Sequence, residues 1–192
     1  MMMNQEALKI FMETQRSDLS TASTLPLLNQ FKKFPETTDI MILYFNEFLR
    51  CTDNKLRLAP SILLGALSEL IVITLVQEIG RFLEDPNAIT SYKEKRGNSR
   101  KDYVITLLQK TKERVQQKRP LQLEEERCFR EAIGILELMF DSIRLNRNEY
   151  AHPEPSMSIS ELPEPEVFIT HASAFNTYAK ALLHLVYLVE HV

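Results

Sequence analysis

Glycine is scarce in this chain: the 192 residues include only Gly65, Gly80, Gly97 and Gly134. All-β folds need many tight turns with positive φ, and glycine adopts that conformation at the lowest cost. The phosphate-binding loops of common nucleotide-dependent enzymes need closely spaced glycines, and neither G-x-G-x-x-G nor G-x-x-x-x-G-K occurs here. The low glycine content therefore disfavours an all-β fold and excludes those loops.

Hydrophobic residues recur at helical spacing along almost the whole chain. The spacing predicts helices over residues 6–15, 25–34, 38–50, 60–83, 100–117, 123–150 and 167–190. In the segment 38–50, one face is predicted to hold Ile40, Leu43, Tyr44, Phe48 and Leu49. We therefore expect an all-α fold, a helical bundle of about six to seven helices with a four-helix core.

Capping residues and a proline mark several of the predicted helix starts. Thr38 or Asp39 offers an N-cap to the third helix, and Asn98 or Ser99 offers one to the fifth. Pro60 suits the first turn of the fourth helix. These signals support the helix boundaries that periodicity predicts.

The length and mean composition fit one domain with one hydrophobic core. A mass of 22.3 kDa with 44% hydrophobic and 26% charged residues is ordinary for a globular protein. We expect a single all-helical domain over residues 1–192, with 1–56 as an N-terminal helical extension and 57–192 as the core bundle. The proline-rich segment 153–166 is predicted to be a loop, because the two helices that flank it must cover each other's apolar faces.

Two cysteines, Cys51 and Cys128, are too far apart in sequence to form a CxxC pair. The pattern indicates neither a zinc site nor a disulfide framework, and it suits a reducing cytosol. The first residues lack the basic flank and apolar run of a secretory signal. We expect a cytoplasmic protein that needs no metal and no cofactor.

Residues 58–76 form an apolar window whose only charged residue is Glu69, and the window is long enough to span a bilayer. The alternative is a central helix surrounded by other helices, which is also apolar on all sides. We expect the buried helix and no membrane, because polar residues resume at position 77 and no basic cluster closely flanks the window.

Charge is distributed unevenly along the chain. Residues 91–119 contain ten basic and three acidic residues, a local charge of +7, whereas the whole chain carries −3. The rest of the chain therefore carries −10. The first part of this segment supplies a candidate RNA-binding set: Lys93, Lys95, Arg96, Arg100 and Lys101. The alternative interpretation is an ordinary solvated helix with its entry loop.

The strongest local motif closes the longest predicted helix. Pro153 disfavours a helical conformation at the residue before it, so the helix is expected to end at His152 or one residue earlier. Arg147, Asn148 and His152 then lie within about one helical turn of one another. An arginine fork binds phosphate oxygens, and histidine moves protons near neutral pH. This pair suits RNA cleavage through the RNA's own 2′-hydroxyl.

One arginine and one histidine are too few for that reaction, because one proton must leave the 2′-oxygen and another must reach the 5′-oxygen. A two-fold dimer that places two such helix ends together doubles the set of groups. The motif therefore predicts a homodimer with a composite site.

The segment from Arg147 to His152, at the end of a long helix in an all-helical chain, resembles the R-x4-6-H signature of the HEPN superfamily. Members of that family are helical bundles. Many are dimeric, metal-independent ribonucleases of toxin–antitoxin, abortive-infection and CRISPR-associated systems, and others have lost activity and act as binding or scaffolding modules. The resemblance implies a defence or toxin role, with an antitoxin or another protein as partner.

The resemblance also implies residue roles. Arg147 and His152 correspond to the catalytic pair, and Asn148 matches the polar residue that often follows the arginine. The family commonly carries an acidic or polar residue on an earlier core helix near the arginine, and Glu69 is the candidate here. The chain departs from the pattern of toxins silenced by nucleotide transfer, which have a tyrosine two residues after the histidine, where this chain has Glu154.

Each of these residues has a structural alternative. Arg147 could pair with Asp141 or Glu149, and His152 could simply end the helix. Arg144, one turn before Arg147, could add a phosphate contact or pair with Asp141. Glu69 could pair with a basic residue instead of supporting the motif.

The sequence leaves three functions open. The first is an endoribonuclease that acts as a homodimer on RNA, and the second is a catalytically silent module that binds a protein or nucleic acid. The acidic segment 154–166 favours the second, because it repels a nucleic acid. The third is membrane association through residues 58–76.

Overall fold

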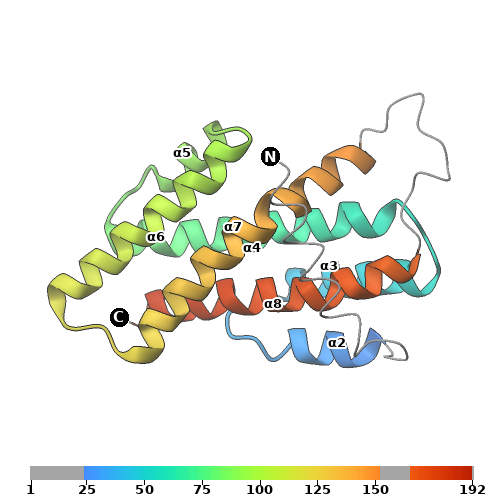
Figure 1. Ribbon diagram of the computed structural model, residues 1–192, viewed down its shortest axis with the longest axis horizontal. Helices are drawn as coiled ribbons and strands as arrows, with labels where there is room; N and C mark the ends of the chain where they lie inside the picture. The colour runs from blue at the N-terminus through green and yellow to red at the C-terminus, as the bar shows by residue number, and fades with distance from the viewer. Residues whose placement is uncertain (1–23, 152–164, 192) are drawn as a thin grey trace.

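The computed structural model describes residues 24–151 and 165–191, apart from the side chains at positions 24, 141–142, 144–151 and 165–166. Within these residues the chain forms helices and no strand, which confirms the all-α bundle (Figure 1). The helices are α2 (Thr24–Phe31), α3 (Asp39–Asp53), α4 (Ala59–Leu83), α5 (Ala88–Glu94), α6 (Asn98–Lys118), α7 (Leu123–Ala151) and α8 (Pro165–Glu190). The helix expected over residues 6–15 lies outside the described residues.

Two of the predicted helix starts are confirmed and one is wrong. Thr38 caps α3, where its hydroxyl accepts a hydrogen bond from the Met41 amide at 3.4 Å, and Pro60 lies in the first turn of α4. The N-cap of α6 is Gly97 and not Asn98 or Ser99. The chain enters α6 with a φ of 56° at residue 97, a conformation that glycine adopts without a Cβ penalty.

Helix α5 was not predicted from the sequence. It has only seven residues, which is too short for hydrophobic periodicity to be visible. Its two buried residues are Ala88 and Tyr92, and both pack into the common core. The helix is therefore stabilised by tertiary contacts and not by its own pattern.

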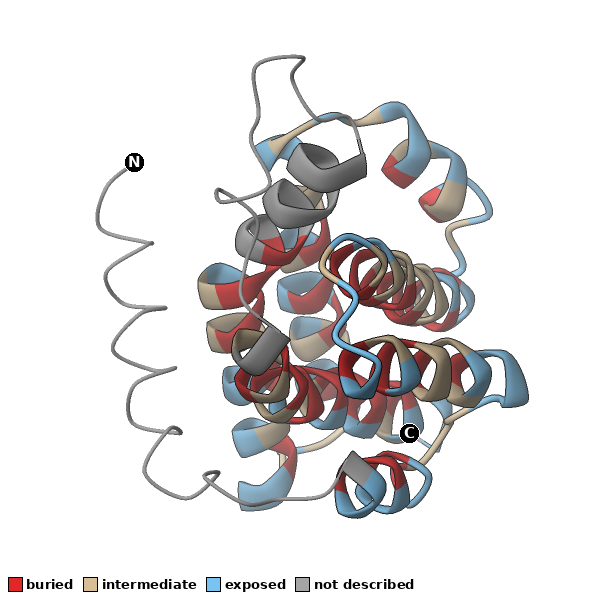
Figure 2. Ribbon diagram, turned by 90° about the vertical axis from the view of Figure 1, so that its right-hand side faces the viewer, coloured by how far each residue is buried: buried red, intermediate tan, exposed pale blue. Residues whose placement is uncertain are grey.

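Helix α4 is the central element of the bundle. Helices α3, α7 and α8 pack directly on it, and α8 also packs on α3 and on α7, to form a four-helix core. Helix α2 covers α3 and α8, and the pair α5 and α6 covers the opposite side of α4 (Figures 1 and 2). In Figure 2 the buried faces of these helices all point inward.

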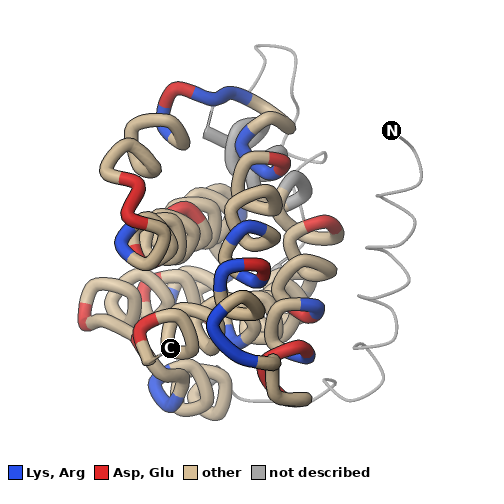
Figure 3. The backbone as a smooth tube through the Cα atoms, turned by 90° about the vertical axis from the view of Figure 1, so that its left-hand side faces the viewer, with Lys and Arg blue, Asp and Glu red and all other residues tan. Residues whose placement is uncertain are grey.

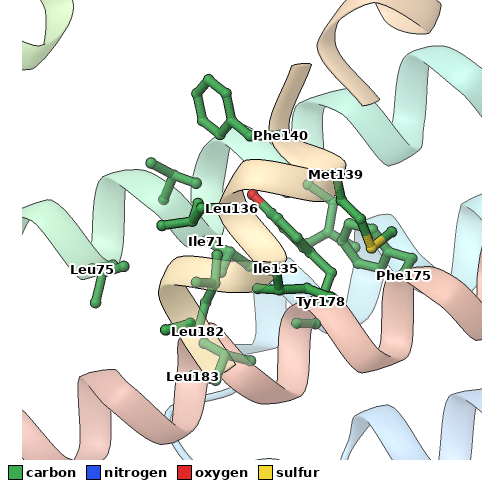
Figure 4. Close-up of a cluster of buried hydrophobic side chains, with 14 of the residues drawn as sticks. Ile71, Leu75, Ile135, Leu136, Met139, Phe140, Phe175, Tyr178, Leu182 and Leu183 are labelled. Atoms are coloured by element: carbon green, nitrogen blue, oxygen red, sulfur yellow. The ribbon is translucent and has the colours of Figure 1, made fainter. Parts of the chain in front are cut away.

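The centre of the core is a cluster of aliphatic and aromatic side chains from three helices (Figure 4). Helix α4 contributes Ile71 and Leu75, and α8 contributes Tyr178. The other labelled members are Ile135, Leu136, Met139 and Phe140 from α7, and Phe175, Leu182 and Leu183 from α8. Fully burying one such aliphatic or aromatic side chain contributes about 1.5–3 kcal/mol, so this cluster is a major source of stability.

The buried face of α3 differs from the expected one. Ile40 and Leu43 are exposed, whereas Phe45 is fully buried. The Phe45 ring lies 4.5 Å from Phe31 of α2 and 6.0 Å from Phe175 of α8. Apolar residues surround much of α3, so periodicity alone leaves its orientation open, and these ring contacts decide it. They also join residues 24–53, part of the expected extension, to the same core as the rest of the bundle.

Helix α4 is also the one helix among the described residues that is long and apolar enough to cross a membrane. In its most apolar window, 56% of the residues are buried inside the bundle. The central position of α4 accounts for that composition, since a helix that other helices surround is apolar on all sides.

Candidate functional site

The motif-bearing end of α7 is described only in part. Helix α7 extends to Ala151, in agreement with the helix end that Pro153 predicts. Arg144, Arg147 and Asn148 lie in its last two turns. Their side chains, and His152 as a whole, lie outside the described residues. How these groups meet therefore stays a prediction.

Glu69 pairs with a basic residue, as the structural alternative predicted. Arg100 Nη1 of α6 donates to Glu69 Oε1 at 3.1 Å. The Glu69 side chain is 31% exposed and that of Arg100 is 23% exposed, so water screens the pair only partly. The contact fixes the start of α6 against the middle of α4.

The Glu69–Arg100 pair lies beside α7, one helical turn before the motif. Both residues line a small cavity of about 20 Å³, to which α7 contributes Phe140 and Ile143. That volume has room for about one water molecule. The backbone of Arg147 is four residues beyond Ile143, which corresponds to about 6 Å along the axis of α7. The cavity therefore marks the part of the bundle where the motif begins.

Arg100 uses its whole guanidinium fork on the chain itself. Besides the bond to Glu69, its Nε donates to the Lys95 carbonyl at 2.8 Å and its Nη2 donates to the Lys93 carbonyl at 3.3 Å. The guanidinium also lies 5.2 Å from the centre of the Tyr92 ring. These contacts hold the connection between α5 and α6 in one conformation, because a planar fork that binds three groups has little freedom left.

Two further arginines of the basic segment also pair within the chain. Arg114 donates to Glu84 at 2.7 Å and to the Leu83 carbonyl at 3.2 Å, so it binds the end of α4. Arg119 donates to Glu125 at 2.6 Å, and this bond lowers the pKa of the Glu125 carboxyl. The charge of +7 in residues 91–119 is therefore partly neutralised by neighbouring elements.

The exposed cations of the segment are mostly lysines. Lys93, Arg96, Lys110 and Lys118 are exposed. Figure 3 shows lysine and arginine positions along α6 and in the segment that precedes it. Lys93 and Arg96 precede the end of α6 that adjoins the cavity, and Lys118 lies at the opposite end of the helix. Lys93 and Arg96, together with the half-buried Lys95 and Lys101, flank Arg100 in sequence, and Arg100 lines the cavity.

Two histidines of α8 and one that directly follows it differ in their surroundings. His171 packs edge-on against Phe168, with ring centres 5.7 Å apart, and burial lowers the pKa of His171 to about 4. His184 is exposed and its pKa is lowered by desolvation and by Lys180. In the exposed His191, Nδ1 is 2.7 Å from the Tyr187 carbonyl oxygen. His171 is therefore neutral near pH 7 and packs against Phe168, which indicates a structural role.

Neither cysteine provides a reactive thiolate. Cys51 and Cys128 are both free and half-buried. Burial, with nearby acidic groups, raises the pKa of each thiol, so both stay protonated near neutral pH. In the part of the chain that the structure describes, no group of three or more histidine, cysteine or acidic side chains could hold a metal ion.

Neither the place of Tyr92 nor the role of Arg100 could be predicted from the sequence. The sequence groups Arg100 with the candidate RNA-binding residues, and no sequence signal links it to Glu69, 31 residues away. Tyr92 lies in the unpredicted helix α5. A tyrosine directly before a run of cations is the signal that the sequence offers.

Comparisons of the chain with protein-family models, curated proteins and solved structures give no significant match.

Proposed function

We propose that this chain is a metal-independent endoribonuclease of the HEPN type that acts as a homodimer. One observation carries the proposal: Glu69, Arg100 and Ile143 line one cavity at the level where the motif begins. An acidic residue of the central helix and an arginine at the start of α6 are thus next to α7, one turn before Arg147. Such a nuclease would serve a defence or toxin system.

The proposed reaction uses the 2′-hydroxyl of the RNA as the nucleophile. The 2′-oxygen loses its proton to a base and attacks phosphorus, and the bond from phosphorus to the 5′-oxygen breaks as that oxygen receives a proton. The products are a 2′,3′-cyclic phosphate and a 5′-hydroxyl. His152 from each of two subunits would supply the base and the acid. Arg147 would stabilise the charge on the phosphorane.

The supporting residues have narrower roles in this proposal. Glu69 holds Arg100 and thereby the basic loop before α6. Arg144 would add a contact to a neighbouring phosphate. Asn148 would donate a hydrogen bond within the site.

A second candidate is a catalytically silent module that binds a protein or nucleic acid. The arginine pairing favours it, because three of the four arginines in residues 91–119 bind carboxylates of this chain. Less charge is then left for a substrate. An antitoxin or another protein would be the partner in that case.

Cleavage of single-stranded RNA in EDTA separates the two candidates. We expect the wild-type protein to produce fragments with 2′,3′-cyclic phosphate ends, and His152→Ala and Arg147→Ala to abolish them. The matched controls are His191→Ala, just after α8, and Arg127→Ala on the first turns of α7, about 30 Å along the helix axis from Arg147. Both controls should cut like the wild type.

Circular dichroism and thermal unfolding would verify that the variants stay folded. Cleavage that persists in both motif variants would overturn the roles of Arg147 and His152. Absence of cleavage by the wild type on every RNA tested would favour the silent module.

A further inference from the structure

We propose that the connection between α5 and α6 binds the sugar-phosphate backbone of single-stranded RNA, with Arg100 as its positioning residue. This rests on the proposed function and names where the substrate strand lies. The phosphate-binding side chains would be Lys93, at the end of α5, and Lys95 and Arg96 of the connection. We call this set the basic loop.

The basic loop is positively charged after its internal pairing is counted. Residues 93–101 carry five cations and one anion, Glu94. Arg100 is paired with Glu69, whereas Lys93 and Arg96 are exposed to solvent. Lys95 lies over the Tyr103 ring at 5.0 Å, which holds its chain along the surface. Three cations in four residues match a short run of consecutive phosphates.

The backbone of the loop is open to a ligand. A Cβ placed at Gly97 would have no atom within 4 Å, so the space beside the Gly97 α-carbon is open. No side chain caps the first turn of α6, and the positive end of the helix dipole adds to the charge of the basic loop. These features add to the attraction that the cations exert on an anion, and they do not by themselves define a site.

Arg100 determines the shape of the basic loop. Its fork binds the carbonyls of Lys93 and Lys95, and its remaining bond joins α4 through Glu69. A lysine at this position keeps the charge but cannot bind three groups in one plane. Arg100 would therefore act by holding the loop and not by touching RNA.

The position of the basic loop favours an RNA substrate over other anionic partners. The loop adjoins the cavity that includes Ile143, one turn before Arg147. A strand held on the loop can therefore continue towards the end of α7. In-line attack by a 2′-oxygen needs a flexible backbone, which a duplex does not offer, so a single strand is the form expected.

RNA binding without cleavage provides the test. In the full-length His152→Ala protein, the triple variant K93Q/K95Q/R96Q is compared with K110Q/K112Q/K118Q, which removes the same charge from the other half of α6. Binding of a labelled single-stranded RNA is measured by fluorescence anisotropy over a range of salt concentrations. The loop variant should bind about tenfold more weakly or worse. Its plot of log affinity against log salt should be flatter by about 2, the value for three lost phosphate contacts on a single strand.

Arg100→Lys tests the positioning role. It should weaken RNA binding and flatten the salt dependence although the net charge is unchanged. Arg114→Lys is the matched control, because Arg114, like Arg100, binds a carboxylate and a backbone carbonyl oxygen of this chain but lies at the other end of α6. The control should bind like the parent protein. Equal affinity of Arg100→Lys and Arg114→Lys would overturn the positioning role.

Equal losses of RNA affinity in the two triple variants, or no loss in either, would overturn the basic loop as the binding surface. Single-stranded DNA of the same sequence should bind with similar affinity and salt dependence, because the basic loop contacts phosphates and not the 2′-hydroxyl. If the wild-type protein binds RNA through the loop and cuts none, the nuclease proposal fails and the binding surface stands. If it cuts RNA while the loop variant binds normally, the binding surface fails and the nuclease proposal stands.

Discussion

Glu69 of α4 and Arg100 of α6 meet at 3.1 Å across 31 residues of sequence. The pair joins the central helix of the bundle to the segment that carries Lys93 and Lys95. It stands beside Ile143, one turn before the motif on α7. A contact in this place bears on both stability and RNA binding, and each can be measured separately.

Removing the Glu69 carboxylate should lower the free energy of unfolding. In Glu69→Gln, the half-buried Arg100 loses its charge partner, and we expect a loss of about 1 kcal/mol in urea denaturation. Glu84→Gln is the control, because Glu84 pairs with Arg114 but its side chain is 79% exposed. That change should cost less than about 0.5 kcal/mol. Equal losses in the two variants would contradict the structural importance of the Glu69 pair.

Two helical glycines should respond oppositely to alanine. A Cβ at Gly80 of α4 would lie 2.8 Å from the Ala88 Cβ and 3.1 Å from the Asp85 carbonyl oxygen, so Gly80→Ala should destabilise by about 1–3 kcal/mol. At Gly134 of α7 nothing lies within 4 Å, and Gly134→Ala should stabilise by about 0.5–1 kcal/mol through helix propensity. Chemical denaturation measures both. A neutral Gly80→Ala would show that α5 does not pack this closely on α4.

Stability should fall in mild acid because of His171. Burial lowers its folded-state pKa to about 4, below the ordinary value of 6.5, so the unfolded chain binds more protons between these values. The contribution is complete above about pH 6.5 and is lost as the pH falls towards 4. It amounts to at most about 3 kcal/mol. Urea denaturation over this range should show a smaller pH-dependent loss for His171→Gln than for the wild type.

The control for this experiment is His191→Gln, which changes an exposed histidine at the end of α8. It should retain the wild-type loss of stability in acid. The comparison uses the change with pH within each variant, because His171→Gln also alters packing against Phe168. Identical pH dependence in all three proteins would contradict the burial of His171.

A composite site should make an inactive subunit dominant. When wild-type protein is mixed with an equal amount of His152→Ala and the subunits exchange freely, about one quarter of the dimers are fully wild type. If both copies of His152 are needed, RNA cleavage should fall to about a quarter of the wild-type value at equal total protein. Independent monomers would retain about half. A mixture with His191→Ala should keep full activity.

Helix type and approximate extent could be predicted from sequence where apolar residues recur over several turns. Helices α4, α6, α7 and α8 satisfy this condition, and their observed ends lie within about two residues of the predicted ones. Helix α5 could not be predicted, because seven residues hold too few apolar positions for a period to be visible. The orientation of α3 could not be predicted either, since its apolar residues do not form a single face and Phe45 is selected by the rings of α2 and α8.

The candidate site also has a part that could be predicted from the sequence and a part that could not. Arg147, Asn148 and His152 could be singled out from sequence, because they lie within six residues and their relation follows from the geometry of one helix. The partner of Glu69 could not, because ion pairs between helices depend on how those helices cross. The sequence does not show which cations of residues 91–119 are paired. In the folded chain Arg100, Arg114 and Arg119 form ion pairs, so the exposed positive charge is mainly that of lysines.

By itself the sequence determined that this chain is helical and lacks glycine-rich phosphate loops, since both depend on local conformational preferences. Only the tertiary structure decided that the isolated acid of the central helix meets Arg100, and that Gly97 rather than a polar side chain begins α6. The physical reason is that a helix is held by bonds between near neighbours in sequence. A site is held by side chains whose distance is set by the packing of the whole core.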